Sequence, residues 1–381
     1  MVDPALDPAC AQLRKRVVAF ARDLEHDVRE HDRDESFDHG AWQRCAELGL
    51  LGNPIPADLG GAGLDVLRTV VAFEAFGFGC ADNGLAFALG AHLWACTMPL
   101  LELGTREQCE RWIPGLVSGA LVGAHAASER EAGSDVFAMR TSAVRDGDRY
   151  VLHGRKAHVT NAPVADLLLV FANVDPLFGH AGISAFLVER SQPGVSVSDP
   201  ISKMGMRSAL MGDVVLDGCE VPADRMLGKE GAGAAIFGRG MEWERAFIMA
   251  PALGAMDRLL QRTLAYARRR VQFGRPISSF QAVSHQIAEM HRAVETSRAL
   301  LYRVAARKDA GKRIAAEAAL VKLHLSESWA AVATTALQLH GALGYLTETE
   351  IERDVRDALA GRIYSGTTEI QRDLVARYLG A

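Results

Sequence analysis

Two acidic side chains on one predicted helix have the type and spacing needed to move a proton. Both lie in MEWERAFIMAPALG, residues 241–254. The residues three, four and seven positions after the second of them, Glu244, are all apolar: Phe247, Ile248 and Pro251. Because these positions share one helix face, Glu244 is a lone carboxylate at the head of an apolar face. An apolar setting disfavours the charge and raises the pKa of the carboxyl, which suits a general base.

The other glutamate, Glu242, has a different setting. Arg245 follows it by three positions, so we expect a Glu242–Arg245 ion pair at a solvated surface. For Glu244 the alternative to a base is a buried ion pair with an arginine or another group of the helical bundle.

The elements that must position these residues follow the order helices, strands, helices. Residues 9–120 have helical periodicity, interrupted by a Pro- and Gly-rich loop at 53–65. Within this part, residues 66–79 and 84–104 are too apolar for surface helices and are expected in a buried core. Four strand-like segments then follow, at 148–162, 165–174, 182–191 and 213–222.

The strand section ends near 224–233, and helical periodicity returns to the end of the chain. It predicts one long amphipathic run at 237–270 and further helices at 280–311 and 315–341. Such an order indicates segregated α and β domains, mainly α with a β middle domain. We expect domains at residues 1–120, 121–228 and 229–381.

Composition favours a soluble globular protein and excludes several classes. The 381 residues are 49% hydrophobic and 23% charged, with a net charge of −5 and mean hydropathy near zero. No basic stripe indicates nucleic-acid binding, and no apolar run of about 18 residues is apparent, so no membrane span is expected. The N-terminal stretch lacks the pattern of a signal peptide, which favours a cytoplasmic protein. Six scattered cysteines without a C-x-x-C pair indicate packed thiols and no metal site.

Six short segments carry a resemblance to a known family. They are SEREAGSD (128–135), GRKAHVTNA (154–162), KMGMRS (203–208), RRRVQFGRPISSFQAV (268–283), LQLHGALGY (337–345) and YSGTTEIQR (364–372). In order and spacing they resemble the motifs of acyl-CoA dehydrogenases. This resemblance implies an N-terminal helical domain, a middle β-barrel or sandwich domain and a C-terminal four-helix bundle. It also implies FAD and an α,β-dehydrogenation, in which a base takes the α-proton of a thioester and the β-hydrogen leaves as hydride to the flavin.

The resemblance places FAD contacts in two groups of residues. The first group holds the flavin ring: His125, Ala127, Ser128, Gly133, Ser134, His158 and Thr160. His158 replaces an aromatic residue, often Trp, and its imidazole can still stack. The alternative for the Gly-Ser-Asp segment is a turn with capping roles only. The second group comprises Arg270, Gln272, Phe273, Gln281, Gln338, Gly341, Ala342, Thr367 and Glu369.

Arg270 of the second group matches an arginine that reaches the FAD pyrophosphate of a neighbouring subunit, and a guanidinium suits phosphate oxygens. The alternative is a solvated basic helix end. Ala342 replaces a glycine of the family pattern. The cross-subunit arrangement implies a homo-oligomer, a dimer or a tetramer.

The position of the catalytic base differs from the commonest pattern of this family. The commonest pattern, Y-E-G-T, has a glutamate where this chain has Ser365, whose hydroxyl we expect only to line the pocket. A minority pattern, found in isovaleryl-type enzymes, puts the glutamate on the first helix of the C-terminal bundle, where Glu244 stands. Both lines of reasoning predict Glu244 as the catalytic base. The residues expected around the substrate are Ser134, Arg245, Tyr364, Ser365 and Gly366.

Finer segments resemble the branch of this family that oxidises L-prolyl groups on carrier proteins in pyrrole and prodiginine-type pathways. They are VTNAPVAD (159–166), GISAFLVE (182–189), the Trp243-Glu244 pair and S-G-T for E-G-T. The resemblance implies a phosphopantetheinyl carrier protein as partner and either an electron-transfer flavoprotein or O₂ as oxidant. The alternatives are a short branched-chain acyl-CoA dehydrogenase, an enzyme for another carrier-bound acyl unit such as a polyketide extender, and a flavoprotein scaffold without catalysis.

Overall fold

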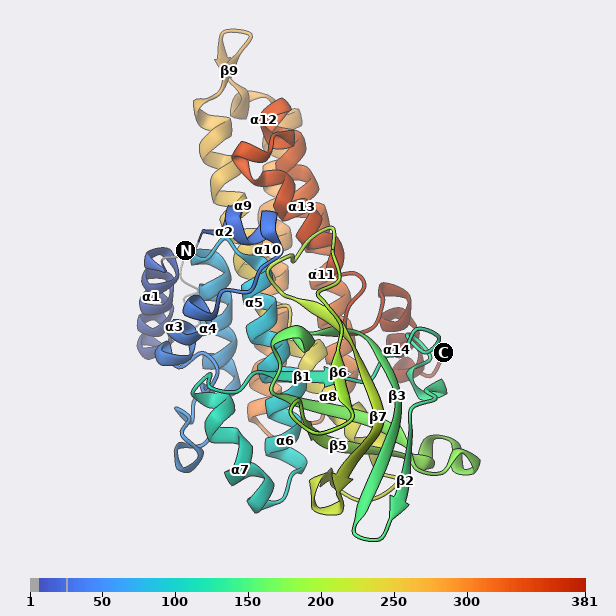
Figure 1. Ribbon diagram of the computed structural model, residues 1–381. Coiled ribbons are helices and arrows are strands. Elements are labelled where there is room, and N and C mark those ends of the chain that lie inside the picture. The colour runs from blue at the N-terminus through green and yellow to red at the C-terminus, as the bar shows by residue number, and fades with distance from the viewer. Residues whose placement is uncertain (1–6, 25–26) are drawn as a thin grey trace.

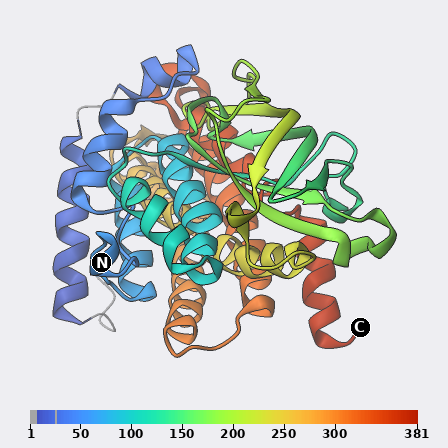
Figure 2. The same ribbon diagram turned by 60° about the horizontal axis from the view of Figure 1, so that its bottom comes forward.

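The computed structural model describes residues 7–24 and 27–381 (Figure 1). Helices form both ends of the chain and a sheet forms its middle, so the expected fold class is confirmed. In Figure 2 the N-terminal helices and the strands lie on neighbouring sides of the C-terminal bundle.

Most of the N-terminal helices begin at polar caps and bury apolar faces. They are α1 Pro8–Asp23, α2 Val28–Asp34, α3 His39–Leu48, α4 Val66–Gly79, α5 Asn83–Gly90, a π-helical stretch Ala91–Thr97, α6 Met98–Leu103 and α7 Arg106–Val117. Asp65 caps α4 through the Arg68 amide, and Thr105 forms a capping box with Gln108 at α7. The predicted loop at 53–65 is present and contains only the 3₁₀ turn Ala57–Leu59.

The two apolar segments form the buried core of this part, as expected. Asn83–Leu103 is also the one helical stretch in the described ranges that is long and apolar enough, by length and composition, to cross a membrane. The expectation that no such stretch exists is therefore wrong. In this stretch 83% of the most apolar window is buried inside the protein, as in the core helix of a soluble fold.

The middle of the chain forms a mixed sheet of eight strands in the order β6-β7-β3-β2-β4-β5-β8, with β1 parallel to β4. Their bounds are β1 Gly123–Ala126, β2 Ser142–Asp146, β3 Arg149–Thr160, β4 Leu167–Asn173, β5 Ile183–Glu189, β6 Val195–Val197, β7 Met211–Pro222 and β8 Met226–Leu227. The four predicted strands correspond to β3, β4, β5 and β7. The other four are two to five residues long, too short for a period-2 pattern.

Both faces of the sheet are covered along β4 and β5. Leu167, Leu169 and Phe171 of β4 join the large core shared with the helices. Leu168 and Val170 belong to a second core, which lies on the other face of the sheet. Because successive strand residues point to opposite faces, a strand buried on both sides becomes a continuous apolar run.

The C-terminal part is a helical bundle with a small hairpin at one end. Its elements are α8 Gly233–Phe247, α9 Ala250–Arg269, β9 Val271–Gln272, β10 Arg275–Pro276, α10 Gln281–Asp309, α11 Ala315–His340, α12 Ala342–Tyr345, α13 Ile351–Ala360 and α14 Thr368–Leu379. The single run predicted at 237–270 is wrong, because the helix breaks after Phe247. Pro251 lacks an amide hydrogen and its ring would clash with the Phe247 carbonyl in a continuous helix.

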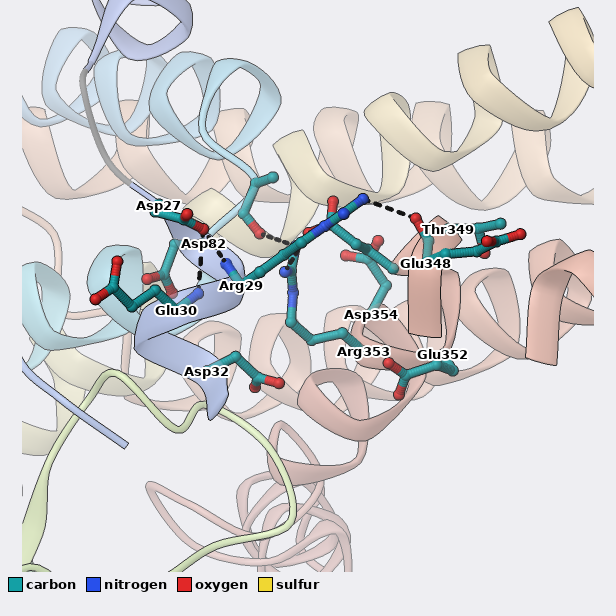
Figure 3. Close-up of polar contacts among 12 residues, drawn as sticks. Asp27, Arg29, Glu30, Asp32, Asp82, Glu348, Thr349, Glu352, Arg353 and Asp354 are labelled. Atoms are coloured by element: carbon teal, nitrogen blue, oxygen red, sulfur yellow. Dashed lines mark hydrogen bonds and ion pairs between the residues drawn. The ribbon is translucent and has the colours of Figure 1, made fainter. Parts of the chain in front are cut away.

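A polar network fastens α2 to the start of α13 (Figure 3). The Arg29 guanidinium donates to the Glu348 carbonyl at 2.7 Å and to Glu350 Oε1 at 2.9 Å. Asp32 pairs with Arg356 at 2.8 Å. The N-terminal part is thereby linked to the segment that precedes Ser365.

All six cysteines are free and buried, as predicted.

Candidate active site

Glu244 lies in the last turn of α8, and its two carboxylate oxygens have different surroundings. Oε1 accepts a hydrogen bond from the Ser365 hydroxyl at 2.5 Å. Oε2 is shielded from solvent and has no hydrogen-bond partner in residues 7–24 and 27–381. Burial raises the pKa of Glu244, while the Ser365 hydrogen bond and the positive charges of Arg245 and Lys322 oppose that rise.

The predicted pair between Glu242 and Arg245 is wrong. Glu242 is only 3% exposed, and its Oε1 accepts from Arg313 at 2.5 Å. Arg245 instead donates from Nε to the Ser365 carbonyl at 3.2 Å. The reason is that α8 is covered on several sides by other elements, so spacing along this helix does not decide which side chains meet water.

The apolar face beneath Glu244 borders a small, narrow cavity with about 10 Å³ of free space. It is lined by Asn83, Ala86, Phe87, Met206, Ile248, Pro251, Ala252, Trp329 and Tyr364. The Tyr364 ring packs on Phe87 at a centroid distance of 4.4 Å, and burial raises the pKa of the Tyr364 phenol. Ile248 and Pro251 belong to the face predicted from the sequence, so the cavity and the carboxylate share one side of the helix junction.

The turn that carries Ser365 is held by three side chains. The Ser365 carbonyl accepts from Arg245 and from Gln371 Nε2, the latter at 3.0 Å. The Gly366 carbonyl accepts from Lys322 Nζ at 2.6 Å and from Gln371 at 3.0 Å. Burial lowers the pKa of Lys322 to about 8. The expectation that the Ser365 hydroxyl only lines the pocket is wrong, because it donates directly to Glu244.

Sequence reasoning missed Lys322 and Gln371. Lys322 is a single cation in the apolar run AALVKLHL of α11, which is a signal for a buried and paired lysine. Gln371 lies inside a segment singled out for its resemblance, yet nothing in its spacing shows that its amide reaches back to the turn.

The first group of expected flavin contacts gathers where β1 meets β3. The Ala157 amide donates to the Ser128 carbonyl at 2.8 Å, and buried Lys156 donates to the Ala127 carbonyl at 3.1 Å. Lys156 also pairs with Glu129 at 2.8 Å. These contacts bring Ala127 and Ser128 alongside the strand end that holds His158 and Thr160.

Two histidines of this group differ in their surroundings. His125 packs against Phe171 and Phe237, and burial, with a smaller effect of Lys156, lowers its pKa to about 4, so the ring is neutral at pH 7. His158 is exposed at a register shift between β3 and β7 and has a φ of 58°. A non-glycine residue in this left-handed region is uncommon and often marks a functional site.

Gly133 and Ser134 lie exposed beyond the Glu129–Ala132 bridge, and a Cβ added at Gly133 would meet no protein atom within 4 Å. Neutral imidazole, hydroxyl groups and accessible backbone together form a donor and acceptor set that suits the polar edge of a flavin ring.

Most of the second group lies far from the first group within one chain. The hairpin with Arg270, Gln272 and Phe273 and the α11–α12 junction lie at the same end of the bundle, away from the sheet (Figure 1). Gln281 begins α10 next to this hairpin, and Gln338, Gly341 and Ala342 are exposed at the junction. Thr367 caps α14 through the Ile370 amide, and Glu369 is exposed in the first turn of that helix.

Metal ligands are not a feature of this region. In the described part of the chain no group of three or more His, Cys, Asp or Glu side chains is arranged to hold a metal ion.

Three family models match successive parts of the chain. They are the N-terminal domain of acyl-CoA dehydrogenase at residues 7–120, its middle domain at 124–219 and its C-terminal domain at 231–380. A similar curated protein is an L-prolyl-[peptidyl-carrier protein] dehydrogenase of Pseudomonas fluorescens, 42% identical over 92% of each chain.

Two solved structures are similar over almost the whole chain. The crystal structure of the prolyl acyl carrier protein oxidase AnaB has a TM-score of 0.98 and 47% identity, covering 99% of this chain and 100% of that one. The structure of PigA with FAD and proline has a TM-score of 0.96 and 35% identity, covering 100% and 99%.

Proposed function

The chain belongs to the acyl-CoA dehydrogenase family, and we propose that it oxidises an L-prolyl thioester on a phosphopantetheinyl carrier protein. The product would be the pyrrole-2-carboxyl thioester, reached in two two-electron steps. The observation that carries this proposal is the buried Oε2 of Glu244, which has no hydrogen-bond partner among the described residues and lies one turn before Ile248 in the cavity wall. The similarity to prolyl-carrier-protein enzymes supports the choice of acyl group.

FAD is the cofactor that the donor set of the middle domain fits. Ser134, Thr160 and the backbone near Ser128 would hold the polar edge of the ring, with His158 beside it. When bound, FAD supplies the acceptor for the hydride that leaves the β-carbon.

Glu244 would take the α-proton of the thioester through Oε2. A carboxylate in a dry pocket is a stronger base than one in water, because burial raises its pKa toward the operating pH. The surrounding apolar side chains, Phe87, Ile248 and Tyr364, limit the access of water to the reacting carbon.

A second copy of the chain would complete the cofactor site. The end of the bundle exposes apolar side chains, among them Phe273 at 93% and Tyr345 at 78%, next to Arg270 and Gln338. Covering this end in a dimer or tetramer would bury these side chains and bring the Arg270 guanidinium to the FAD pyrophosphate of the partner. We further propose a cytoplasmic location and reoxidation by an electron-transfer flavoprotein or O₂.

The test compares acyl carriers and acyl groups on the FAD-loaded protein. L-prolyl carrier protein, L-prolyl-CoA, isovaleryl-CoA and a carrier-bound polyketide extender unit would each be incubated, and products identified by mass spectrometry. We expect oxidation of the prolyl carrier protein at the highest kcat/KM, because carrier docking adds binding energy that free CoA lacks. Faster oxidation of isovaleryl-CoA would assign a branched-chain acyl-CoA dehydrogenase instead, and no oxidation of any thioester would indicate a non-catalytic flavoprotein.

A further inference from the structure

The hydrogen bond between Ser365 and Glu244 has a function beyond pocket lining. Resting on the proposed role of Glu244, we propose that Ser365 is the positioning residue of this base. Its hydroxyl holds Oε1, so that Oε2 remains the oxygen that accepts the substrate proton. The two oxygens receive these different roles because Oε1 accepts the Ser365 hydrogen bond and Oε2 has no partner among the described residues.

Ser365 is the one hydrogen-bond donor to the Glu244 carboxylate within residues 7–24 and 27–381, and no cationic side chain there lies within 4.0 Å of it. The charged or titratable groups facing it are Arg245 on the same helix, Lys322 on α11 and Tyr364 before the turn. Arg245 and Lys322 direct their hydrogen bonds to backbone carbonyls instead. A carboxylate without a direct cationic partner depends strongly on the one hydroxyl that does reach it.

The turn is built to keep that hydroxyl in place. Ser365 has a φ of 56°, a conformation that costs free energy for a residue with a side chain and persists only when its surroundings enforce it. Arg245, Gln371 and Lys322 enforce it by binding the carbonyls of Ser365 and Gly366. Two of these donors are charged, which gives the stronger kind of hydrogen bond.

Losing the hydroxyl should change the titration of the base. Because a donor to the charged form lowers the pKa of a carboxyl, its removal raises that pKa further. A base works only when ionised, so the acid limb of the rate profile should move to higher pH. A single charged hydrogen bond corresponds to a shift of about one pH unit.

The experiment uses Ser365→Ala and Ser365→Gly in the FAD-loaded enzyme. Glycine adopts a positive φ without strain, whereas alanine keeps the Cβ, so the two variants share only the loss of the hydroxyl. Ser297→Ala, which changes a buried serine on α10, is the matched control. The readouts are the pH profile of anaerobic flavin bleaching by L-prolyl carrier protein and the titration of the Glu244 carboxyl by infrared difference spectroscopy, with Glu244→Gln as reference.

We expect both Ser365 variants to shift the acid limb and the carboxyl titration upward by about one unit, with rates recovering at higher pH. Unchanged profiles in both variants, or a change in Ser365→Ala alone, would overturn the inference, because the shape of the turn and not the hydroxyl would then matter. Glu244→Gln tests the base separately. Loss of flavin reduction in this variant, together with unchanged pH profiles in the Ser365 variants, would leave Glu244 as the base and show that Ser365 does not position it. Ser365→Cys, a weaker donor, should give a smaller shift and serves if the other variants fold poorly.

Discussion

Replacing Glu244 by glutamine tests the base most directly. Glutamine keeps the length of the side chain and an oxygen that can accept from Ser365, but it has no basic oxygen left. The other polar groups near the site are poor substitutes at pH 7, because Arg245 and the mostly protonated Lys322 donate to backbone carbonyls and Ser365 is a hydroxyl already engaged with the side chain. Loss of a general base slows a reaction about 10²–10⁴-fold, and flavin reduction should fall by at least ~10²-fold.

The pH dependence of the wild type has a definite sign. The pKa of Glu244 is raised by burial, so the rate of reduction should fall as the pH drops through this raised value. The same shift acts on stability in the opposite sense: the folded state binds the proton more tightly than the unfolded chain, so ionisation of Glu244 weakens folding as the pH rises. Glu244→Gln should therefore unfold at an equal or higher temperature than the wild type at pH 8.

The assay is stopped-flow bleaching of the flavin absorbance under anaerobic conditions, with FAD content and thermal unfolding measured on the same samples. We expect Glu244→Gln to keep FAD and its fold while bleaching at least a hundredfold more slowly, as the lower bound of the general-base effect requires. Bleaching at the wild-type rate would refute Glu244 as the base.

Moving the carboxylate to the turn is an informative companion experiment. Ser365→Glu in the Glu244→Gln background offers a base on the other side of the 2.5 Å contact. The longer side chain would start from a strained φ of 56° and enter space that a ring substrate needs. We expect little recovery with the prolyl substrate and more with a straight-chain acyl thioester. Full recovery with the prolyl substrate would show that the cavity does not constrain the position of the base.

Three further predictions concern residues away from Glu244. Arg270→Ala should lower FAD content and weaken self-association, measured by absorbance and size-exclusion chromatography; an FAD-replete variant would remove Arg270 from the phosphate site. Lys156→Met should destabilise the fold by about 3 kcal/mol and reduce FAD retention, because it leaves the buried Glu129 without its cation, and adding Glu129→Gln should restore part of the loss. Burial raises the pKa of Asp357 to about 7, so the contribution of this residue to stability should fall by up to about 4 kcal/mol between about pH 4 and pH 7, and the melting temperature of Asp357→Asn relative to the wild type should rise over that range.

The parts of the fold that the sequence predicted are those with a strong local signal. The segments at 66–79 and 84–104 are apolar over most of their length, which is typical of a buried helix, and the four longer strands have turn residues at both ends. The break after Phe247 was missed although Pro251 marks it, because the periodicity on both sides continues across the junction. The short strands β6 and β8 exist through pairing with β7 and β5, which no local pattern encodes.

In the candidate site too, features with a local sequence signal could be predicted and contacts between distant segments could not. The apolar face below Glu244 could be predicted, since positions four and seven residues further on do border the cavity. The partner of Glu242 could not, because Arg313 lies 71 positions away in the connection between α10 and α11. The Ser365 hydrogen bond was also out of reach, since it depends on a backbone turn that Lys322 and Gln371 hold from other helices.

The proposed base on α8 and the hydroxyl on the turn between α13 and α14 would separate two tasks that a single glutamate on that turn would combine. The helix fixes the position of the Glu244 backbone through its own hydrogen-bond ladder and continues into the apolar wall at Ile248. The turn sets the orientation and the basicity of the carboxylate through one hydroxyl, and it leaves the space beside Tyr364 to the cavity. If Glu244 is the base as proposed, changes in the turn would adjust the pH dependence of proton abstraction while the carboxylate stays where the helix places it.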